Sequence, residues 1–205
     1  MSQPIEAVVF DVGRVLYRWQ LSELMAKVIA DPDERAFVLE HVVTEAWHFQ
    51  HDAGRPIAAM TAERIGQFPQ YETAIRAYAD RFLETIPGPV PGSLEIVEEL
   101  DASGMPLFAI TNFGSEFWDR FCPTAPVFDR FRDIVVSGKE YLVKPDPAIY
   151  ELAARRFGYA PPAMFFIDDN AANIAAANAL GWNTHHFIDA AALRADLTAR
   201  GLLRA

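Results

Sequence analysis

Three acidic residues occupy positions where buried strands of a parallel sheet would end. Asp11 follows the apolar run 7–10, and Asp168 and Asp169 follow the run 164–167. Ligand crevices in such sheets lie beyond the carboxyl ends of the strands, so we expect these acids to converge. Two unit charges 4 Å apart repel by about 4 kcal/mol at an effective dielectric near 20. The cluster therefore suits Mg²⁺, which typically bridges to a substrate phosphate, whereas a single Asp could merely cap the following helix.

Three further polar residues accompany the acids in sequence. Thr111 and Asn112 end a second apolar run, where a hydroxyl and an amide can donate hydrogen bonds to phosphate oxygens. Lys144 precedes a helix start and can balance the acids and stabilise charge that develops on a substrate. Taken singly, Asn112 could serve only a turn and Lys144 could be solvated.

The elements that position these residues alternate between strand and helix patterns. Short continuous apolar runs are typical of strands buried on both faces of a parallel sheet. They occur at 7–10, 107–110, 134–136 and 164–167, with a weaker fifth candidate at 184–187. Helical patterns follow at 93–102, after Asp146-Pro147 and at 170–180. Ser93 is expected to cap the first of these helices. The alternation predicts an α/β fold, a doubly wound, Rossmann-like parallel sheet.

One long segment interrupts this alternation. Residues 18–87 read as helical throughout, and the Pro/Gly-rich stretch 87–92 reads as a stiff hinge. We therefore expect a core formed by residues 1–17 and 88–205, with residues 18–87 inserted as a helical cap over the sheet.

Composition restricts the classes of partner. At 205 residues the chain is long enough for one domain with a sizeable insertion, and its net charge of −10 argues against a non-specific nucleic-acid binder. No apolar run approaches the roughly 18 residues that span a bilayer, and the N-terminal residues lack a signal-peptide pattern. The single cysteine, Cys122, fits a reducing compartment. We expect a cytoplasmic monomer or homodimer acting on a small molecule.

In order, these residues resemble the four signature motifs of the haloacid dehalogenase-like (HAD) hydrolase superfamily. The motifs are VFDVGRVL at 9–16, ITN at 110–112, KPD at 144–146 and FIDD at 166–169, the last followed by Asn173. The resemblance covers nearly the whole chain, and the insertion matches a helical cap placed between the first two motifs.

The resemblance implies a covalent hydrolytic mechanism. Asp11 would attack an electrophilic centre and form an aspartyl intermediate that water hydrolyses. Thr111 would hold a transferring oxygen, and Lys144 would neutralise charge on the nucleophile and the substrate. Asn112 and Arg14 would contact the substrate, which we expect to be a small phosphorylated metabolite.

The resemblance also implies a magnesium site. Asp11 and Asp168 would bind Mg²⁺, Asp169 would be a further ligand or a support, and the Gly13 carbonyl would complete the contacts from the protein. Gly13 is also the main departure, because phosphatases of the family usually carry a second Asp there as the general acid and base. Loss of such a group typically costs about 10²–10⁴ in rate. The Asp-x-Gly-x-Val form is similar to a subgroup that contains sugar-phosphate phosphatases.

Two other functions remain open from the sequence. Haloacid dehalogenases also lack that second acid and need no metal, and Arg14 or Arg18 could bind a carboxylate or halide there. The pair Asp168-Asp169, however, resembles the metal-binding phosphatase form. Alternatively, the chain could be a catalytically silent relative that binds a phosphorylated ligand or a protein.

Within the expected cap, residues 47–55 mix aromatic, titratable and basic side chains. His48 or Arg55 could reach substrate hydroxyls or replace the missing acid. The alternative interpretation is that this stretch packs the cap and leaves its two histidines partly exposed. The pair at 185–186 is expected to be one packed and one solvated histidine rather than a metal site. Cys122 is expected to be inert.

Overall fold

The computed structural model describes residues 4–204, so residues 1–3 and 205 of the predicted core lie outside the described part. A five-stranded parallel sheet forms the centre of the molecule, in the order β5-β4-β1-β6-β7. Its strands are β1 (Ala7–Phe10), β4 (Leu107–Thr111), β5 (Asp133–Val136), β6 (Met164–Asp168) and β7 (Asn183–His186). The predicted α/β fold and all five predicted strands are confirmed.

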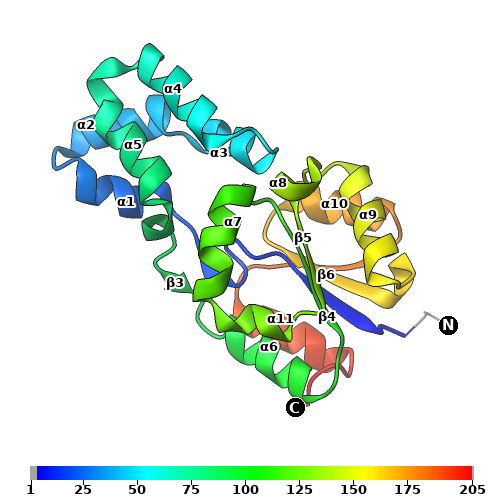
Figure 1. Cartoon of the computed structure of the whole chain (residues 1–205). Coiled ribbons are helices and arrows are strands. Elements are labelled where there is room, and N and C mark those ends of the chain that lie inside the picture. Colours follow the sequence, from blue (N-terminus) through cyan, green and yellow to red (C-terminus); the bar gives the residue numbers. More distant parts are fainter. Residues whose placement is uncertain (1–3, 205) are drawn as a thin grey trace.

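The central strand β1 is fully buried because helices cover both faces of the sheet (Figure 1). Successive side chains of a strand point to opposite faces. Val8 and Phe10 accordingly join one hydrophobic cluster, and Ala7 and Val9 join the other. In register, Val9 pairs with residues of both neighbouring strands, which places the ends of β1, β4 and β6 at one edge.

Five helices flank the sheet in two layers. The face that carries Val8 packs against α6 (Ser93–Ala102), α7 (Ser115–Phe121) and α11 (Ala190–Ala199). The opposite face packs against α9 (Pro147–Phe157) and α10 (Ala171–Ala179). A short helix, α8 (Ser137–Glu140), follows β5 at the edge of the sheet where the strands end. Single-turn helices complete the loops at Cys122–Thr124, Pro126–Arg130 and Pro161–Ala163.

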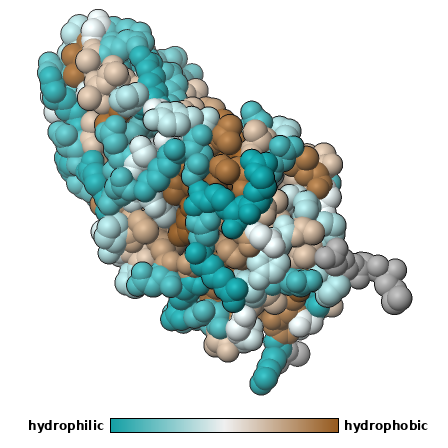
Figure 2. Space-filling view, turned by 45° about the vertical axis from the view of Figure 1, so that its right-hand side comes forward, coloured by the Kyte–Doolittle hydropathy of each residue, from teal (hydrophilic) through white to brown (hydrophobic). Residues whose placement is uncertain are grey.

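Between Leu21 and Thr85 every element is helical, and we refer to residues 21–85 as the helical segment. It contains α1 (Leu21–Val28), α2 (Pro32–Phe37), a π-helical turn (Val38–Val42), α3 (Glu45–Asp52), α4 (Ile57–Gln67) and α5 (Glu72–Asp80), with 3₁₀ turns at Pro69–Tyr71 and Phe82–Thr85. The segment forms a narrow lobe beyond the carboxyl ends of the strands (Figure 1). Hydrophobic surface is visible where this lobe meets the core (Figure 2). Within residues 4–204, no helix has the length and apolar character needed to cross a membrane.

The two connections between the core and the helical segment run side by side. β2 (Tyr17–Arg18) and β3 (Gly88–Pro89) form a two-residue antiparallel pair, so the expectation of no strand in 18–87 fails at Arg18. Gly88 has φ of +144°, a conformation that favours glycine, and it allows the chain to turn into this pair. The two connections thus hold each other in register at the base of the segment.

The predicted cap of α6 is wrong. Gly92, in a left-handed conformation, occupies the N-cap position, and Ser93 is the first helical residue. The Ser93 hydroxyl is buried without a hydrogen-bond partner. Only a side chain at the N-cap position can accept hydrogen bonds from the free amides of the first turn. Ser93 lies one residue further along the helix and cannot do so.

Candidate active site

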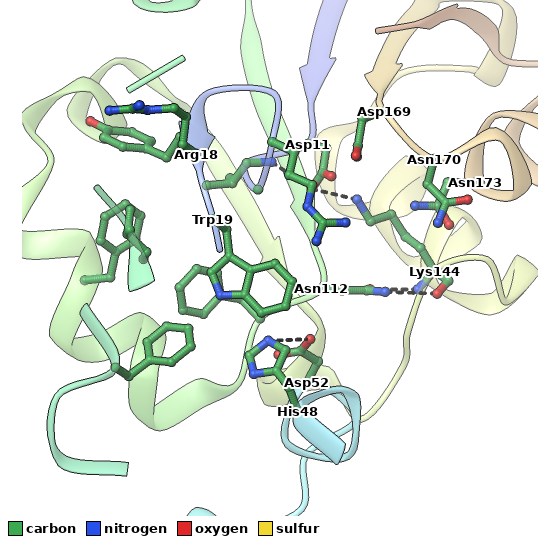
Figure 3. A pocket seen from close by; sticks show the side chains of 18 residues that line it. Asp11, Arg18, Trp19, His48, Asp52, Asn112, Lys144, Asp169, Asn170 and Asn173 are labelled. Carbon is green, nitrogen blue, oxygen red and sulfur yellow. Dashed lines mark hydrogen bonds and ion pairs between the residues drawn. The ribbon is translucent and has the colours of Figure 1, made fainter. Parts of the chain in front are cut away.

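A pocket of about 160 Å³ opens where β1, β4 and β6 end, between the sheet and the helical segment (Figure 3). Asp11, Asn112, Lys144 and Asp169 line it from the core. His48, Asp52 and Phe82 line it from the helical segment, and Trp19 and Ile86 line it from the two connections. Asp11, Asn112, Lys144 and Asp169 therefore share one cavity, as expected at the strand ends of a doubly wound sheet, whereas Thr111 and Asp168 do not line it.

Lys144 lies at the centre of the site, only 2 % exposed. Its Nζ is 2.8 Å from Asp11 Oδ1 and donates to Asp168 Oδ2 at 2.7 Å and to the Ile110 carbonyl at 2.9 Å. An ammonium has three protons, so these three acceptors satisfy it completely. Burial alone would lower the pKa of Lys144, but the carboxylates of Asp11 and Asp168 outweigh burial and raise that pKa. The lysine is therefore a fixed cation between two acids.

The contacts of Asp11 leave one carboxylate oxygen free. Oδ1 accepts a hydrogen bond from the Val12 amide at 2.7 Å, in addition to the contact with Lys144. Within residues 4–204, Oδ2 accepts no hydrogen bond. Burial raises the pKa of Asp11 to about 7, assisted by Asp168 and Asp169 and opposed by Lys144. A carboxylate with one oxygen anchored and the other free is suited to attack an electrophile.

The two motif-four acids occupy different environments. Asp168 is fully buried, and both of its oxygens are engaged, by the Asn170 amide, the Asn173 side chain and Lys144. Asp169 lines the pocket and turns its carboxylate toward Asp11 (Figure 3). Partial burial and then Asp168 raise the pKa of Asp169, while Arg14 and Lys144 act in the opposite direction. Asp169, rather than Asp168, is therefore placed to meet a bound group.

Asp11, Asp168 and Asp169 form a cluster that could hold a metal ion. Each offers a carboxylate oxygen, and these oxygens lie within 4.8 Å of one another. One lysine faces three carboxylates, and burial together with mutual repulsion raises the pKa of both Asp11 and Asp169. A hard divalent cation bound by oxygen would relieve this repulsion, so the residues fit such an ion.

The neighbouring residues Asn112 and Thr111 have different environments, which the sequence did not predict. The Asn112 amide donates to the Lys144 carbonyl at 3.0 Å and accepts from the Lys144 amide at 2.9 Å, so it fixes the backbone of that lysine. Asn112 also lines the pocket. The Thr111 hydroxyl is buried and has no hydrogen-bond partner among the described residues. A buried hydroxyl without a partner is unusual, and Thr111 is not among the residues that line the pocket.

Arg14 and Gly13 form the turn after Asp11. Arg14 adopts a left-handed conformation (φ 61°), forms an ion pair with Glu45 and lies 5.0 Å above the Trp19 ring. It lines the pocket, but its charge is already shared with the helical segment. Gly13 does not have the positive φ that favours glycine, and a Cβ built there meets no atom within 4 Å. Local sterics therefore do not require the glycine.

The polar residues on the far side of the pocket form a buried network that the sequence only partly indicated. His48 is 6 % exposed, and its Nε2 is 3.2 Å from Asp52 Oδ2. Its Nδ1 is hydrogen-bonded to the Tyr78 hydroxyl at 2.5 Å. His51 is also buried, so the expectation of partly exposed histidines is wrong. The i, i+4 spacing of His48 and Asp52 on a helix was the signal that could have identified the pair.

Arg18, which the sequence singled out beside Arg14, lines the pocket, whereas Arg55, the two histidines at 185–186 and Cys122 do not. Arg55 forms an ion pair with Glu63, away from the acids. His185 is half-buried against Asp196, and His186 is exposed, in agreement with one packed and one solvated histidine. Burial raises the pKa of the Cys122 thiol, which agrees with an inert cysteine.

The C-terminal end of α3 docks directly onto the core. The Ser137 hydroxyl donates to the Asp52 carbonyl at 2.6 Å. The His51 ring lies so close to Gly114 that a Cβ there would be 1.9 Å from a ring atom. Tyr141 covers Gly54 in the same way. These contacts place His48 and Asp52 in the pocket.

A doubly wound parallel sheet with a buried acid–lysine cluster at its strand ends, faced by an inserted helical segment, defines an enzyme class with a Rossmann-like core and an aspartate-based site. Residues 5–181 match the haloacid dehalogenase-like hydrolase family. The chain belongs to that family, and it is a hydrolase.

Three relatives illustrate the range of the family. The chain is 23 % identical to the sesquiterpene phosphatase astK of Aspergillus oryzae, over 96 % of this chain and 97 % of that protein. It is 32 % identical to (S)-2-haloacid dehalogenase 4A of Burkholderia cepacia, over 46 % of this chain and 41 % of that protein. A HAD family enzyme from Bacteroides thetaiotaomicron, solved in complex with magnesium and inorganic phosphate, shares the fold with a TM-score of 0.68 and 20 % identity, over 90 % and 95 % of the two chains.

Proposed function

We propose that this protein is a Mg²⁺-dependent phosphatase of small phosphorylated metabolites that acts through an aspartyl-phosphate on Asp11. The observation that carries the proposal is the Lys144 ammonium held between Asp11 and Asp168, which leaves Asp11 Oδ2 free at the pocket. A phosphatase that matches nearly the whole chain supports it, as does a neighbouring structure that binds magnesium and phosphate.

The reaction follows from the placement of these groups. Asp11 Oδ2 attacks phosphorus, the bond between phosphorus and the ester oxygen breaks, and the departing alkoxide takes a proton from water. Water then attacks the phosphorus of the aspartyl-phosphate, which releases inorganic phosphate and restores Asp11. Throughout, Lys144 stabilises the negative charge on Asp11 and on the phosphoryl group. The unpartnered Thr111 hydroxyl is suited to donate to a phosphoryl oxygen.

For the metal we propose Asp11, Asp169 and the Gly13 carbonyl as the protein ligands. When bound, Mg²⁺ supplies positive charge that stabilises the phosphoryl group in the transition state. Asp168 supports the site from behind, because both of its oxygens already accept hydrogen bonds. This assignment reverses the order that the sequence suggested for the two acids. Arg14 and Asn112 contribute at the rim, Asn112 chiefly by holding Lys144.

A second candidate is the dehalogenase activity, supported by the partial match to a haloacid dehalogenase. A dehalogenase needs no metal, so nothing in that reaction would relieve the repulsion among Asp11, Asp168 and Asp169. A silent binding protein would likewise have no use for a free nucleophilic oxygen on Asp11. The geometry of the site therefore supports the phosphatase better than either the dehalogenase or the binding protein.

The proposal extends to the organisation of the chain. Residues 18–87 would act as the cap that selects the substrate, on a core of residues 1–17 and 88–205. The stretch 87–92 would be the hinge. The protein would work in the cytoplasm, since its single cysteine fits a reducing compartment, and it would be a monomer or homodimer.

The test is phosphate release from p-nitrophenyl phosphate and a panel of metabolite phosphates, measured with Mg²⁺ and with EDTA. We expect turnover that needs Mg²⁺ and is lost in Asp11→Asn. Halide release from 2-chloropropionate without metal, in place of phosphate release, would establish the dehalogenase. Silence in both assays, together with binding of inorganic phosphate, would establish the binding protein.

A further inference from the structure

The acidic cluster lies at one end of the pocket. Asp11, Lys144 and Asp169 form that end, the His48–Asp52 pair lies at the other, and Trp19 lies between them (Figure 3). Five apolar side chains line the pocket, and we call them the apolar wall: Trp19, Phe82, Ile86, Phe113 and Phe121. A phosphate held at the acids would place the organic part of its ester against this wall.

The apolar wall is preformed by packing. Phe113 and Phe121 stack with their ring centroids 5.7 Å apart, and Phe82 stacks on Phe117 at 3.9 Å. Trp19 is held between the Arg14 guanidinium at 5.0 Å and the His48 ring at 4.6 Å. These side chains would need no rearrangement to bind an apolar group, which lowers the cost of binding.

Two polar side chains beside the wall, those of His48 and Arg14, already have hydrogen-bond or ion-pair partners. Both ring nitrogens of His48 have partners, namely Tyr78 and Asp52. Arg14 is paired with Glu45. Asp52, only 4 % exposed, keeps one oxygen, Oδ1, that is buried without a partner. The Trp19 indole N–H is also buried without a partner in the described part of the chain. A sugar with several hydroxyls would still bury most of them against Phe82, Ile86, Phe113 and Phe121, which offer no hydrogen bonds, and that is unfavourable.

A second cavity of about 520 Å³ adjoins the first and shares Arg14, Arg18 and Trp19 with it. Its other lining residues are the apolar Leu21, Leu39 and Val90 and the polar Gln20, Ser22 and Glu45. A long apolar group that passes Trp19 would therefore meet three further apolar side chains in a cavity of mixed lining.

We propose that the substrate is a phosphate monoester whose organic part is mainly apolar, packs against the apolar wall, and carries few hydrogen-bonding groups, placed near Asp52 Oδ1 or the Trp19 indole N–H. This inference rests on the proposed phosphatase function and narrows its substrate class away from sugar phosphates.

The first experiment measures kcat/KM for n-alkyl phosphates from methyl to octyl, beside glucose 6-phosphate. Each methylene transferred from water to an apolar surface favours binding by about two- to fourfold. We expect kcat/KM to rise steadily with chain length, and glucose 6-phosphate to fall below butyl phosphate. A flat series, or a preference for the sugar phosphate, would overturn the proposal while leaving the phosphatase function intact.

The second experiment measures binding without turnover. The dissociation constants of methyl- and octylphosphonate, determined by calorimetry with Mg²⁺, should differ by at least tenfold in favour of octylphosphonate. If no ester is hydrolysed but this difference appears, the apolar site stands and the phosphatase function fails. Equal affinities would remove the apolar site.

Ile86→Ala supplies the test at the residue level. Ile86 is half-buried and lines the pocket, so we expect about fivefold to tenfold lower kcat/KM for octyl phosphate and less than twofold change for methyl phosphate. Ile65→Ala is the matched control, because Ile65 is also half-buried in the helical segment but does not line either cavity. Equal losses on both esters, or in both variants, would show a merely structural role for Ile86.

Discussion

At the scale of single residues, the site is organised around Lys144. Its three protons meet Asp11, Asp168 and a backbone carbonyl, so the lysine cannot turn away from the nucleophile. The same arrangement explains why one of two adjacent acids faces the pocket while the other does not. Asp168 uses both carboxylate oxygens to bind Lys144 and the first residues around α10, whereas the Asp169 carboxylate faces the pocket.

Gly13 is the residue at which this chain departs from the common phosphatase pattern, and it yields a prediction. A Cβ at position 13 meets open space, so Gly13→Asp should fold normally and place a carboxyl beside Asp11. That carboxyl can protonate the leaving alcohol, and we expect kcat on alkyl phosphates to rise on the order of tenfold to a hundredfold.

The gain should be small on p-nitrophenyl phosphate, whose leaving group needs little protonation. Gly13→Asn, which has the same shape without a titratable proton, is the control. If the Asp and Asn variants have equal rates on alkyl phosphates, a carboxyl at position 13 does not act as the general acid in this protein.

At the scale of elements, the site depends on how α3 is seated on the core. The end of α3 approaches the loop after β4 so closely that only glycine fits at position 114. This contact, together with the hydrogen bond from Ser137 to the Asp52 carbonyl, determines where His48 and Asp52 lie.

Gly114→Ala tests this seating. The backbone at position 114 (φ −63°, ψ 135°) suits alanine, so the added methyl acts only through its clash with the His51 ring. We expect α3 to be displaced, kcat/KM on the preferred ester to fall at least tenfold, and stability to fall by about 1–3 kcal/mol.

Gly66→Ala is the matched control within the helical segment. Gly66 lies near the end of α4 with open space around its Cα, so alanine should leave activity unchanged. It should also stabilise the protein by up to about 1 kcal/mol through helix propensity. Melting curves and kinetics of the two variants decide the matter, and unchanged kinetics in Gly114→Ala would show that the docking of α3 is not needed.

At the scale of the whole molecule, the acid cluster couples stability to pH and to metal. Burial raises the pKa of Asp11 to about 7 in the metal-free protein, against about 3.9 in the unfolded chain. A carboxyl with a raised pKa contributes to the free energy of unfolding. That contribution is fully present below pH 4 and is lost as pH rises from 4 to 7. The metal-free protein should therefore be less stable at pH 8, because the buried Asp11 carboxylate is ionised there.

Asp11→Asn removes this charge, so in EDTA at pH 8 the variant should be more stable than the wild type. We expect a gain of roughly 1–4 kcal/mol, or about 3–10 °C in Tm, that shrinks toward zero near pH 4. Mg²⁺ should raise the Tm of the wild type at pH 8 and have much less effect on the variant. A variant that is less stable than the wild type at pH 8 without metal would show that Asp11 is held favourably by Lys144 alone.

The fold class, the five strands and the acids at the strand ends could be read from the sequence. Continuous apolar runs are typical of strands buried on both faces, and parallel strands bring their carboxyl ends to one edge, so Asp11 and the acids at 168–169 were expected to meet. Local patterns sufficed because the information lies within a few neighbouring residues.

Three features of the site could be found only in the folded structure. They are which acid faces the pocket, the hydrogen bonds between Asn112 and the backbone of Lys144, and the approach of His48 and Asp52 from the helical segment. These outcomes depend on contacts between residues that are distant in the chain, such as His51 against Gly114 and Asp52 against Ser137. Side-chain type and spacing do not encode such contacts, because the packing of α3 onto the core selects them.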